Sequence, residues 1–119
     1  SKVLTVRNIM ITPSIARLTD GPEHAIHEMR KNALSTVYVV DDRLRLAGIL
    51  TIREAIRALR EGLSIEQVME RDVPTTSPDV MVSDIMPVAA ETPYPIAVVD
   101  GDGQLKGIVT KASVLSSLI

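Results

Sequence analysis

The strongest constraint on the fold of this chain is an internal duplication. Residues 94–110 read YPIAVVDGDGQLKGIVT and follow the same plan as residues 35–51, STVYVVDDRLRLAGILT, with each residue 59 positions after its counterpart. The same offset aligns Ile9-Met10 with Val68-Met69 and Leu59 with Leu118. Self-similarity over nearly the whole chain predicts two copies of one structural unit, at residues 1–60 and 61–119.

Within each copy the hydrophobic period changes in a fixed order. In the first copy an extended piece at 14–18 precedes a helical pattern from Pro22 to Ala33, and the later apolar runs predict strands at 37–40 and 46–50 and then a helix. The second copy gives an extended piece at 74–77, a helix at 82–90, strands at 96–99 and 105–109, and a helix from Lys111. Both copies therefore read β-α-β-β-α, and the fold class is α/β with mixed α+β character.

Three details qualify this pattern. Thr51 can cap the second helix of the first copy, which Gly62 helps to end, and its apolar stripe predicts a core-facing side. That stripe contains Ile52, Ala55, Ile56, Leu59 and Leu63. Pro87 lacks an N–H group and is expected to shorten or kink its helix. Because a sheet of about three strands is small, the two copies are expected to pack about a pseudo-two-fold axis and leave a cleft between them.

Composition excludes several function classes. The 119 residues contain no cysteine, which removes disulfides and thiol catalysis and suits a reducing cytoplasm. A net charge of −2 and only two aromatic residues, Tyr38 and Tyr94, argue against a nucleic-acid partner. No apolar run approaches the ~20 residues of a membrane span. A chain that begins with Ser1 is expected to be a fragment of a longer protein.

The duplicated unit resembles a tandem pair of cystathionine β-synthase (CBS) domains, also called a Bateman module, over residues 7–119. The resemblance depends on the element order, on two VVD turns and on the stretches GILTIRE and GIVTKAS. DVPTTSPD followed by YPIAVVDGDGQLKGIVTKASVLSSL is similar to the C-terminal CBS pairs of ATPase subunits from glycine betaine/proline-type ABC transporters. This implies a regulatory fragment at the cytoplasmic face of the membrane. The fragment lacks the P-loop motif of the ATPase and is not expected to be an enzyme.

Two threonines are the main candidates for ligand contact. Thr51 and Thr110 each follow a strand and precede a helix, where backbone N–H groups favour an anion. The resemblance implies that this Ser/Thr contacts phosphate and that an Asp three residues later holds ribose hydroxyls; here Glu54 and Ser113 replace that Asp. The alternative is that both threonines are helix caps and that Thr51 and Glu54 form a capping box. If a carboxylate helps to hold a ribose, the first copy is the place to look.

Other cleft candidates come from the aligned extended pieces and second strands. They are Arg17, Thr75 and Thr76 in the first extended pieces, and Val37 and Ile96 at the starts of the second strands. A surface arginine is the alternative for Arg17. No metal ligands or catalytic residues are expected. Asp100-Gly-Asp102-Gly lacks the later ligands of a calcium loop and predicts a hairpin turn, and His24 with His27 is weak metal spacing.

The resemblance implies a regulatory adenine-type nucleotide, AMP, ADP, ATP or cyclic di-AMP, in the cleft. It also implies a homodimer through CBS pairs and contact with the ATPase domain of the parent chain. A different function class stays open: a ligand-free dimerisation module that senses ionic strength. Its sequence feature is the stripe of Arg53, Arg57 and Arg60, which can face an anionic membrane surface. The alternative for the stripe is a solvated face whose charge Glu54 and Glu61 offset.

Overall fold

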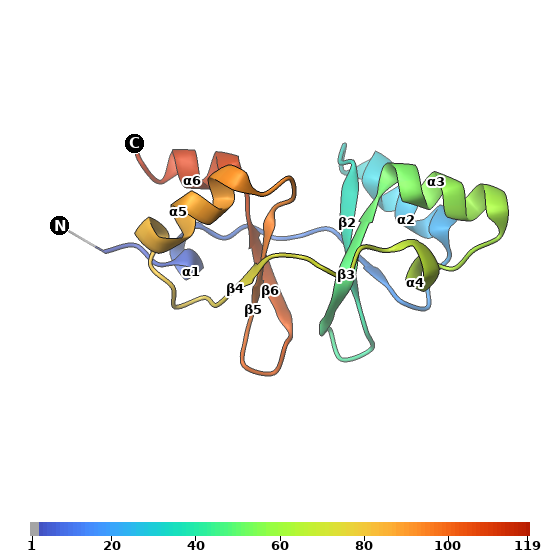
Figure 1. Cartoon of the computed structure of the whole chain (residues 1–119), viewed down its shortest axis with the longest axis horizontal. Coiled ribbons are helices and arrows are strands. Elements are labelled where there is room, and N and C mark those ends of the chain that lie inside the picture. The colour runs from blue at the N-terminus through green and yellow to red at the C-terminus, as the bar shows by residue number, and fades with distance from the viewer. Residues whose placement is uncertain (1–2) are drawn as a thin grey trace. The chain divides into compact units, whose positions relative to one another are not determined.

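The computed structural model describes residues 3–119, which form two compact units, each with one three-stranded sheet (Figure 1). In the unit of residues 13–72, the middle strand pairs in parallel with the first strand and antiparallel with the third. The strands are β1 (Ile15–Arg17), β2 (Thr36–Val40) and β3 (Leu46–Thr51). The helices are α2 (Pro22–Lys31), α3 (Ile52–Glu61) and α4 (Ile65–Val68). Figure 1 shows α2 and α3 side by side against this sheet.

The other unit repeats this topology with residues 3–12 and 73–119. Its middle strand again has one parallel and one antiparallel neighbour. The strands are β4 (Thr75–Thr76), β5 (Ile96–Val99) and β6 (Leu105–Val109). The helices are α1 (Val6–Ile9), α5 (Val82–Glu91) and α6 (Lys111–Ser116). In both units the β hairpin has a register irregularity near its turn, between Val39 and Val40 and between Val98 and Val99.

Each compact unit includes one short segment besides its three strands and two longer helices. This segment precedes the rest of one unit in the chain and follows the rest of the other. The segment around α1 belongs to the unit of 73–119, where Ile11 and Ile108 exchange two backbone hydrogen bonds of 2.9 Å. The equivalent segment around α4 belongs to the unit of 13–72, where Ile49 and Glu70 exchange two bonds of 2.8 Å. The bounds of the compact units therefore differ from those of the sequence repeats. The repeat bounds 1–60 and 61–119 stay a prediction.

Apolar side chains explain why the sheets and helices assemble. All four residues from Val37 to Val40 are buried, and Ala25 and Met29 of α2 pack in the same unit. The second unit buries Ile96, Val98 and Val109 together with Val6 from α1. Removing such side chains from water is the main favourable contribution to folding. Across the described residues, no helix is long and apolar enough to cross a membrane.

The predicted strands and main helices are confirmed, with differences at their edges. The prediction lacked α1 and α4, two single-turn helices that open the copies; Ser64 and Gln67 form a capping box at α4. Helix α2 ends at Lys31, and Ala33 lies beyond it with a left-handed φ of 54°.

Of the two effects predicted for Pro87, the shortening of its helix is wrong, and the kink stays a prediction. Helix α5 continues through Pro87 to Glu91 and has ten residues, as α2 does. Proline removes one N–H donor, but the buried Ile85 and Ala89 on either side anchor the helix in the core of its unit.

The predicted core-facing stripe of α3 is only partly buried. Ala55 is fully buried, and Ile52 and Leu63 pack against the core, but Ile56 and Leu59 are 44% and 52% exposed. The buried side of the helix instead passes through Ala55 and Ala58, whose small side chains allow α3 to approach α2 closely. Two of the four large members of the stripe are left at the surface.

Candidate functional site

Thr51 connects β3 to α3 and caps the helix. Its backbone is extended, with φ −89° and ψ 158°, and its Oγ1 accepts a hydrogen bond of 3.3 Å from the backbone N–H of Glu54. Gly62 ends the same helix with a left-handed φ of 69°. The cap predicted for Thr51 is therefore confirmed, and its hydroxyl has a structural partner.

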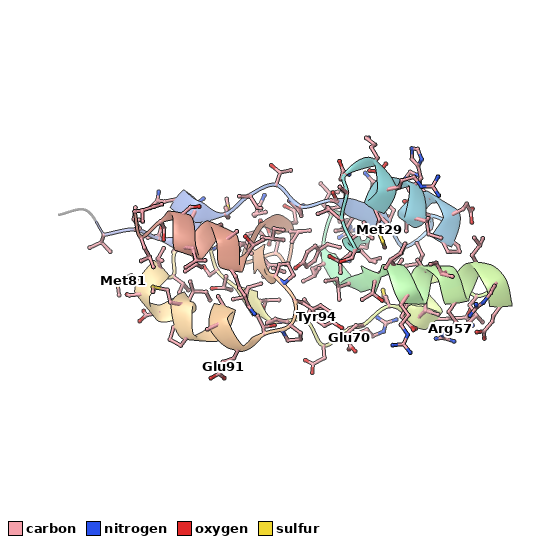
Figure 2. All side chains as sticks on the ribbon, turned by 90° about the horizontal axis from the view of Figure 1, so that it is seen from above. Met29, Arg57, Glu70, Met81, Glu91 and Tyr94 are labelled. Atoms are coloured by element: carbon pink, nitrogen blue, oxygen red, sulfur yellow. The ribbon has the colours of Figure 1, made fainter. Side chains whose placement is uncertain are left out.

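Glu54 faces along the helix surface and pairs with Arg57. Its Oε2 accepts hydrogen bonds of 2.9 Å and 3.3 Å from Nη2 and Nε of Arg57, whose Nη1 also lies 3.7 Å from Glu61. The hydrogen bond to Glu54 raises the pKa of Arg57, and the charges of Glu54 and Glu61 add to the shift. The carboxylate predicted for a ribose is thus engaged by an arginine. Figure 2 shows Arg57 on α3.

The ion pairs of Arg57 decide how much net charge the stripe of Arg53, Arg57 and Arg60 presents. The two glutamates offset the charge of Arg57, the central member of the stripe. The solvated-face alternative therefore has direct support in the contacts of Arg57, while contact with an anionic membrane stays a prediction.

In the second copy the equivalent pair forms a complete capping box. Thr110 Oγ1 accepts from the backbone N–H of Ser113 at 2.9 Å, and Ser113 Oγ accepts from the backbone N–H of Thr110 at 2.9 Å. Ser113 Oγ also lies 2.9 Å from the carbonyl oxygen of Thr110, to which it can donate. The capping box is therefore complete in the second copy, between Thr110 and Ser113. In the first copy Thr51 caps the helix, but Glu54 does not complete a box and pairs with Arg57 instead.

A pocket of about 310 Å³ opens beside Thr110 in the second unit. Three elements build it: the end of α5 and the loop after it, the end of β6, and the first residues of α6. The lining residues are Ala89, Thr92, Pro93, Tyr94, Pro95, Val109, Thr110, Lys111 and Ala112. This volume lies at the lower end of the roughly 300–1,000 Å³ that small-molecule sites occupy.

The loop that forms one wall of the pocket is held by its own polar groups. The backbone N–H of Tyr94 donates to Thr92 Oγ1 at 3.3 Å. Pro93 and Pro95 flank Tyr94 and restrict the backbone on both sides. Figure 2 shows Tyr94 in this loop between α5 and β5. The wall therefore combines a restricted backbone with an aromatic side chain.

The other predicted site residues lie in different environments. Val37 and Ile96 are fully buried in the cores of their units, and neither lines the pocket. Arg17 and Thr75 are exposed, and Thr76 is half-buried in β4 beside Val98. Among the predicted residues only Thr110 lines the pocket.

Sequence reasoning missed the residues that distinguish this pocket. Tyr94 and Lys111 align with Ser35 and Ile52 of the first copy, so the aromatic ring and the cation belong to the second copy alone. Aligning the two copies at the offset of 59 residues shows both differences. Tyr94 lies two residues before the predicted site residue Ile96, and Lys111 follows the predicted site residue Thr110. A comparison of what differs between copies would have found them.

The duplicated topology agrees with a family model. The model described as CBS domain matches the chain twice, at residues 6–61 and 65–119. The chain belongs to the CBS domain family. The predicted tandem CBS pair is thereby confirmed.

Two curated relatives of this CBS pair are transporter subunits. It is 42% identical over 120 residues to the glycine betaine/carnitine transport ATP-binding protein GbuA of Listeria monocytogenes, covering 99% of this chain and 30% of the relative. It is 30% identical over 118 residues to the glycine betaine transport ATP-binding protein OpuAA of Bacillus subtilis, covering 99% and 28%. The chain therefore spans less than a third of either relative. The predicted similarity to ATP-binding subunits of glycine betaine transporters is confirmed.

Solved structures support the same fold. Staphylococcus aureus OpuCA matches with a TM-score of 0.87 at 26% identity, over 93% of this CBS pair and 96% of that chain. Two more distant structures were solved with adenine nucleotides. CBSX2 in complex with AMP has a TM-score of 0.82 at 21% identity, covering 96% of this chain and 95% of that one. CbpB in complex with c-di-AMP has a TM-score of 0.84 at 16% identity, covering 98% and 85%.

Proposed function

We propose that this CBS pair is the regulatory, ligand-sensing part of an ATP-binding subunit of an osmolyte ABC transporter. The observation that carries the proposal is 42% identity to GbuA along almost the entire chain. Glycine betaine stands in the names of both curated relatives, and carnitine in one. In this proposal the ATPase lies elsewhere in the parent chain, at the cytoplasmic face of the membrane, and the CBS pair controls it without catalysing a reaction.

The proposed ligand is an adenine nucleotide, and the pocket beside Thr110 is its proposed site. The ring of Tyr94 and the neighbouring prolines offer an apolar wall for a base, while Lys111 and the Thr110 hydroxyl offer partners for phosphate. A volume of about 310 Å³ favours a mononucleotide over cyclic di-AMP in this pocket. The distant structures with AMP and c-di-AMP support the ligand class.

Ligand-linked stabilisation tests this proposal. A ligand that binds only the folded state at 100 times its Kd adds about 2.7 kcal/mol of stability. Each kcal/mol raises the Tm of a domain of this size by several degrees, about 4–8 °C for 60–100 residues. We therefore expect AMP at 100 times its Kd to raise the Tm by about 10 °C in a thermal-shift panel of AMP, ADP, ATP and cyclic di-AMP.

Two further arms make the thermal-shift panel specific. Lys111→Gln should reduce the shift, whereas Lys31→Gln makes the same chemical change on α2 of the other unit and should leave it unchanged. Absence of a shift with all four nucleotides at millimolar concentration would contradict nucleotide sensing and favour the ligand-free interaction module.

We also propose that the CBS pair forms a homodimer. Leu115 on α6 and Leu118, two residues after its end, are 65% and 57% exposed, and on α3 Ile56 and Leu59 are about half exposed. An apolar groove of about 360 Å³ lies between α5 and α6 and is lined by Met86, Val114 and Leu115 among others. Within the second unit, the groove and the exposed Leu115 and Leu118 form apolar surface of a kind that is typical of protein interfaces. Sedimentation equilibrium measures the expected dimer mass.

A further inference from the structure

We propose that the pocket beside Thr110 recognises the phosphate and base of its nucleotide and does not discriminate at the ribose hydroxyls. This inference rests on the proposed function, and it concerns which part of the ligand determines affinity. It follows from the polar groups that line the pocket, from the engagement of Ser113, and from the position of the nearest carboxylate along α5.

The polar lining of the pocket contains a cation and hydroxyls. Lys111 is charged, and Thr92, Tyr94 and Thr110 contribute hydroxyl groups; the remaining lining residues are Ala, Pro and Val. An ammonium group and hydroxyl donors suit a phosphate, which presents only acceptor oxygens at its charged end. A ribose diol is held most strongly by a carboxylate, which accepts from both hydroxyls, and the lining residues of this pocket include none.

Ser113 does not fill the place of a carboxylate. A serine hydroxyl has one hydrogen and two lone pairs. In the structure Ser113 Oγ accepts from the Thr110 N–H and is placed to donate to the Thr110 carbonyl, each at 2.9 Å. Its hydrogen and one lone pair are therefore engaged inside the helix cap. One lone pair is left to accept from a ribose hydroxyl, and that single hydrogen bond would be neutral, unlike one to a carboxylate.

The nearest acid along the chain also lies outside the pocket. Glu91 ends α5 one residue before Thr92, but it lines a separate hollow with Pro87 and Val88. Figure 2 shows the Glu91 side chain pointing outward from α5. Only Thr92 is shared between this hollow and the pocket. Glu91 therefore lies outside the lining of the pocket, which contains no carboxylate.

Lys111 is the residue that this arrangement makes most important for affinity. It is exposed at the first position of α6. The first copy has Ile52 at the aligned position, so the duplicated fold does not require a cation there. We expect Lys111→Gln to weaken AMP binding by about tenfold, the equivalent of one charge-assisted hydrogen bond.

The test is isothermal titration of the intact chain with AMP, 2′-deoxy-AMP, 3′-deoxy-AMP, adenosine and inorganic phosphate. Both deoxynucleotides should bind within about threefold of AMP, while adenosine and phosphate alone should each bind at least about tenfold more weakly. Lys111→Gln should bring AMP close to adenosine, and the matched variant Lys31→Gln should bind all five compounds as the wild type does.

The outcomes separate this inference from the proposed function. Binding of AMP with a tenfold or greater loss for either deoxynucleotide would overturn ribose indifference and leave nucleotide sensing intact. Equal affinity for AMP and adenosine would overturn the phosphate contact. Absence of binding by every compound would overturn both proposals.

Discussion

Two aspartates at equivalent positions hold the two hairpin turns. Asp41 Oδ1 accepts from the backbone N–H groups of Arg43 and Arg45 at 2.9 Å, and Asp100 Oδ1 accepts from those of Asp102 and Gln104. The hydrogen bond from the Arg45 N–H is the main cause that lowers the pKa of Asp41. Desolvation tends to raise the pKa of Asp100, but its backbone hydrogen bonds and Lys106 outweigh that effect and lower it. The VVD motif is thus a turn signal with a physical cause.

The lowered pKa of Asp41 predicts a pH dependence of stability. A carboxylate with a folded pKa below its unfolded value, about 3.9, binds fewer protons when folded. Its contribution is fully present above that value and is lost as the pH falls through the lowered pKa. We therefore expect the free energy of unfolding to fall below about pH 4, and to fall less steeply in Asp41→Asn.

Urea unfolding between about pH 2 and 7 measures this dependence. Asp42→Asn is the matched control, because Asp42 is the next residue and its side chain is exposed. Equal slopes for Asp41→Asn and Asp42→Asn below pH 4 would show that the turn carboxylate does not carry the effect.

At the scale of the elements, two short backbone segments explain both glycine-led motifs. One contains Met69 and Glu70 and lies beside β3, and the other contains Met10 and Ile11 and lies beside β6. A Cβ at Gly48 of β3 would lie 2.6 Å from the carbonyl oxygen of Glu70 and 3.1 Å from Met69 Sδ. A Cβ at Gly107 of β6 would lie 3.0 Å from Met10 and 3.1 Å from the Ile11 carbonyl. Each glycine therefore permits a backbone segment to cross a strand closely, which a nucleotide-contact interpretation of GILT and GIVT alone does not explain.

Gly48→Ala should destabilise the first unit by about 1–3 kcal/mol, because the obstructing atom is backbone and cannot rotate away. Gly101→Ala is the control: a Cβ there meets no atom within 4 Å, and its effect should stay within about 0.5 kcal/mol. Urea unfolding of both variants measures the difference. Wild-type stability in Gly48→Ala would contradict the close crossing.

At the scale of the whole molecule, the chain passes between its two units at two places, after residue 12 and after residue 72. Val6 in α1 is fully buried in the core of the second unit, and Arg7 pairs with Asp79 at 3.1 Å. The segment around α1 therefore packs on the unit that holds the pocket. Ile11 of this segment pairs with Ile108 in β6, and Val109, the last residue of β6, lines that pocket.

The homodimer is the prediction that belongs to this scale. Sedimentation equilibrium should give about twice the 12.9 kDa mass of one chain. Leu115→Glu should weaken the dimer by tenfold or more, since burying one leucine contributes about 1.5–3 kcal/mol. Ser116→Glu adds the same charge to α6 without removing apolar surface, and it should dimerise more strongly than Leu115→Glu. A monomeric wild type would refute the proposal.

Local patterns determined much of this protein. The duplication, the strands at Thr36–Val40 and Ile96–Val99, the hairpin turns and the threonine caps depend on residues within a few positions of each other, so periodicity and turn chemistry predict them. The same holds for the place of Thr110 between a strand and a helix, which is visible in the sequence.

Only the tertiary structure decided which segment completes which unit and what surrounds Thr110. Ile11 meets Ile108, and Gly48 meets Glu70, through contacts that no local period encodes. Arg57 engages Glu54, and Tyr94 comes to one pocket with Lys111, because loops and helix faces place them together. Each of these is a pairing of side chains or backbones that becomes close only after the sheets and helices have packed, which is why sequence reasoning favoured Glu54 while the pocket lies beside Thr110.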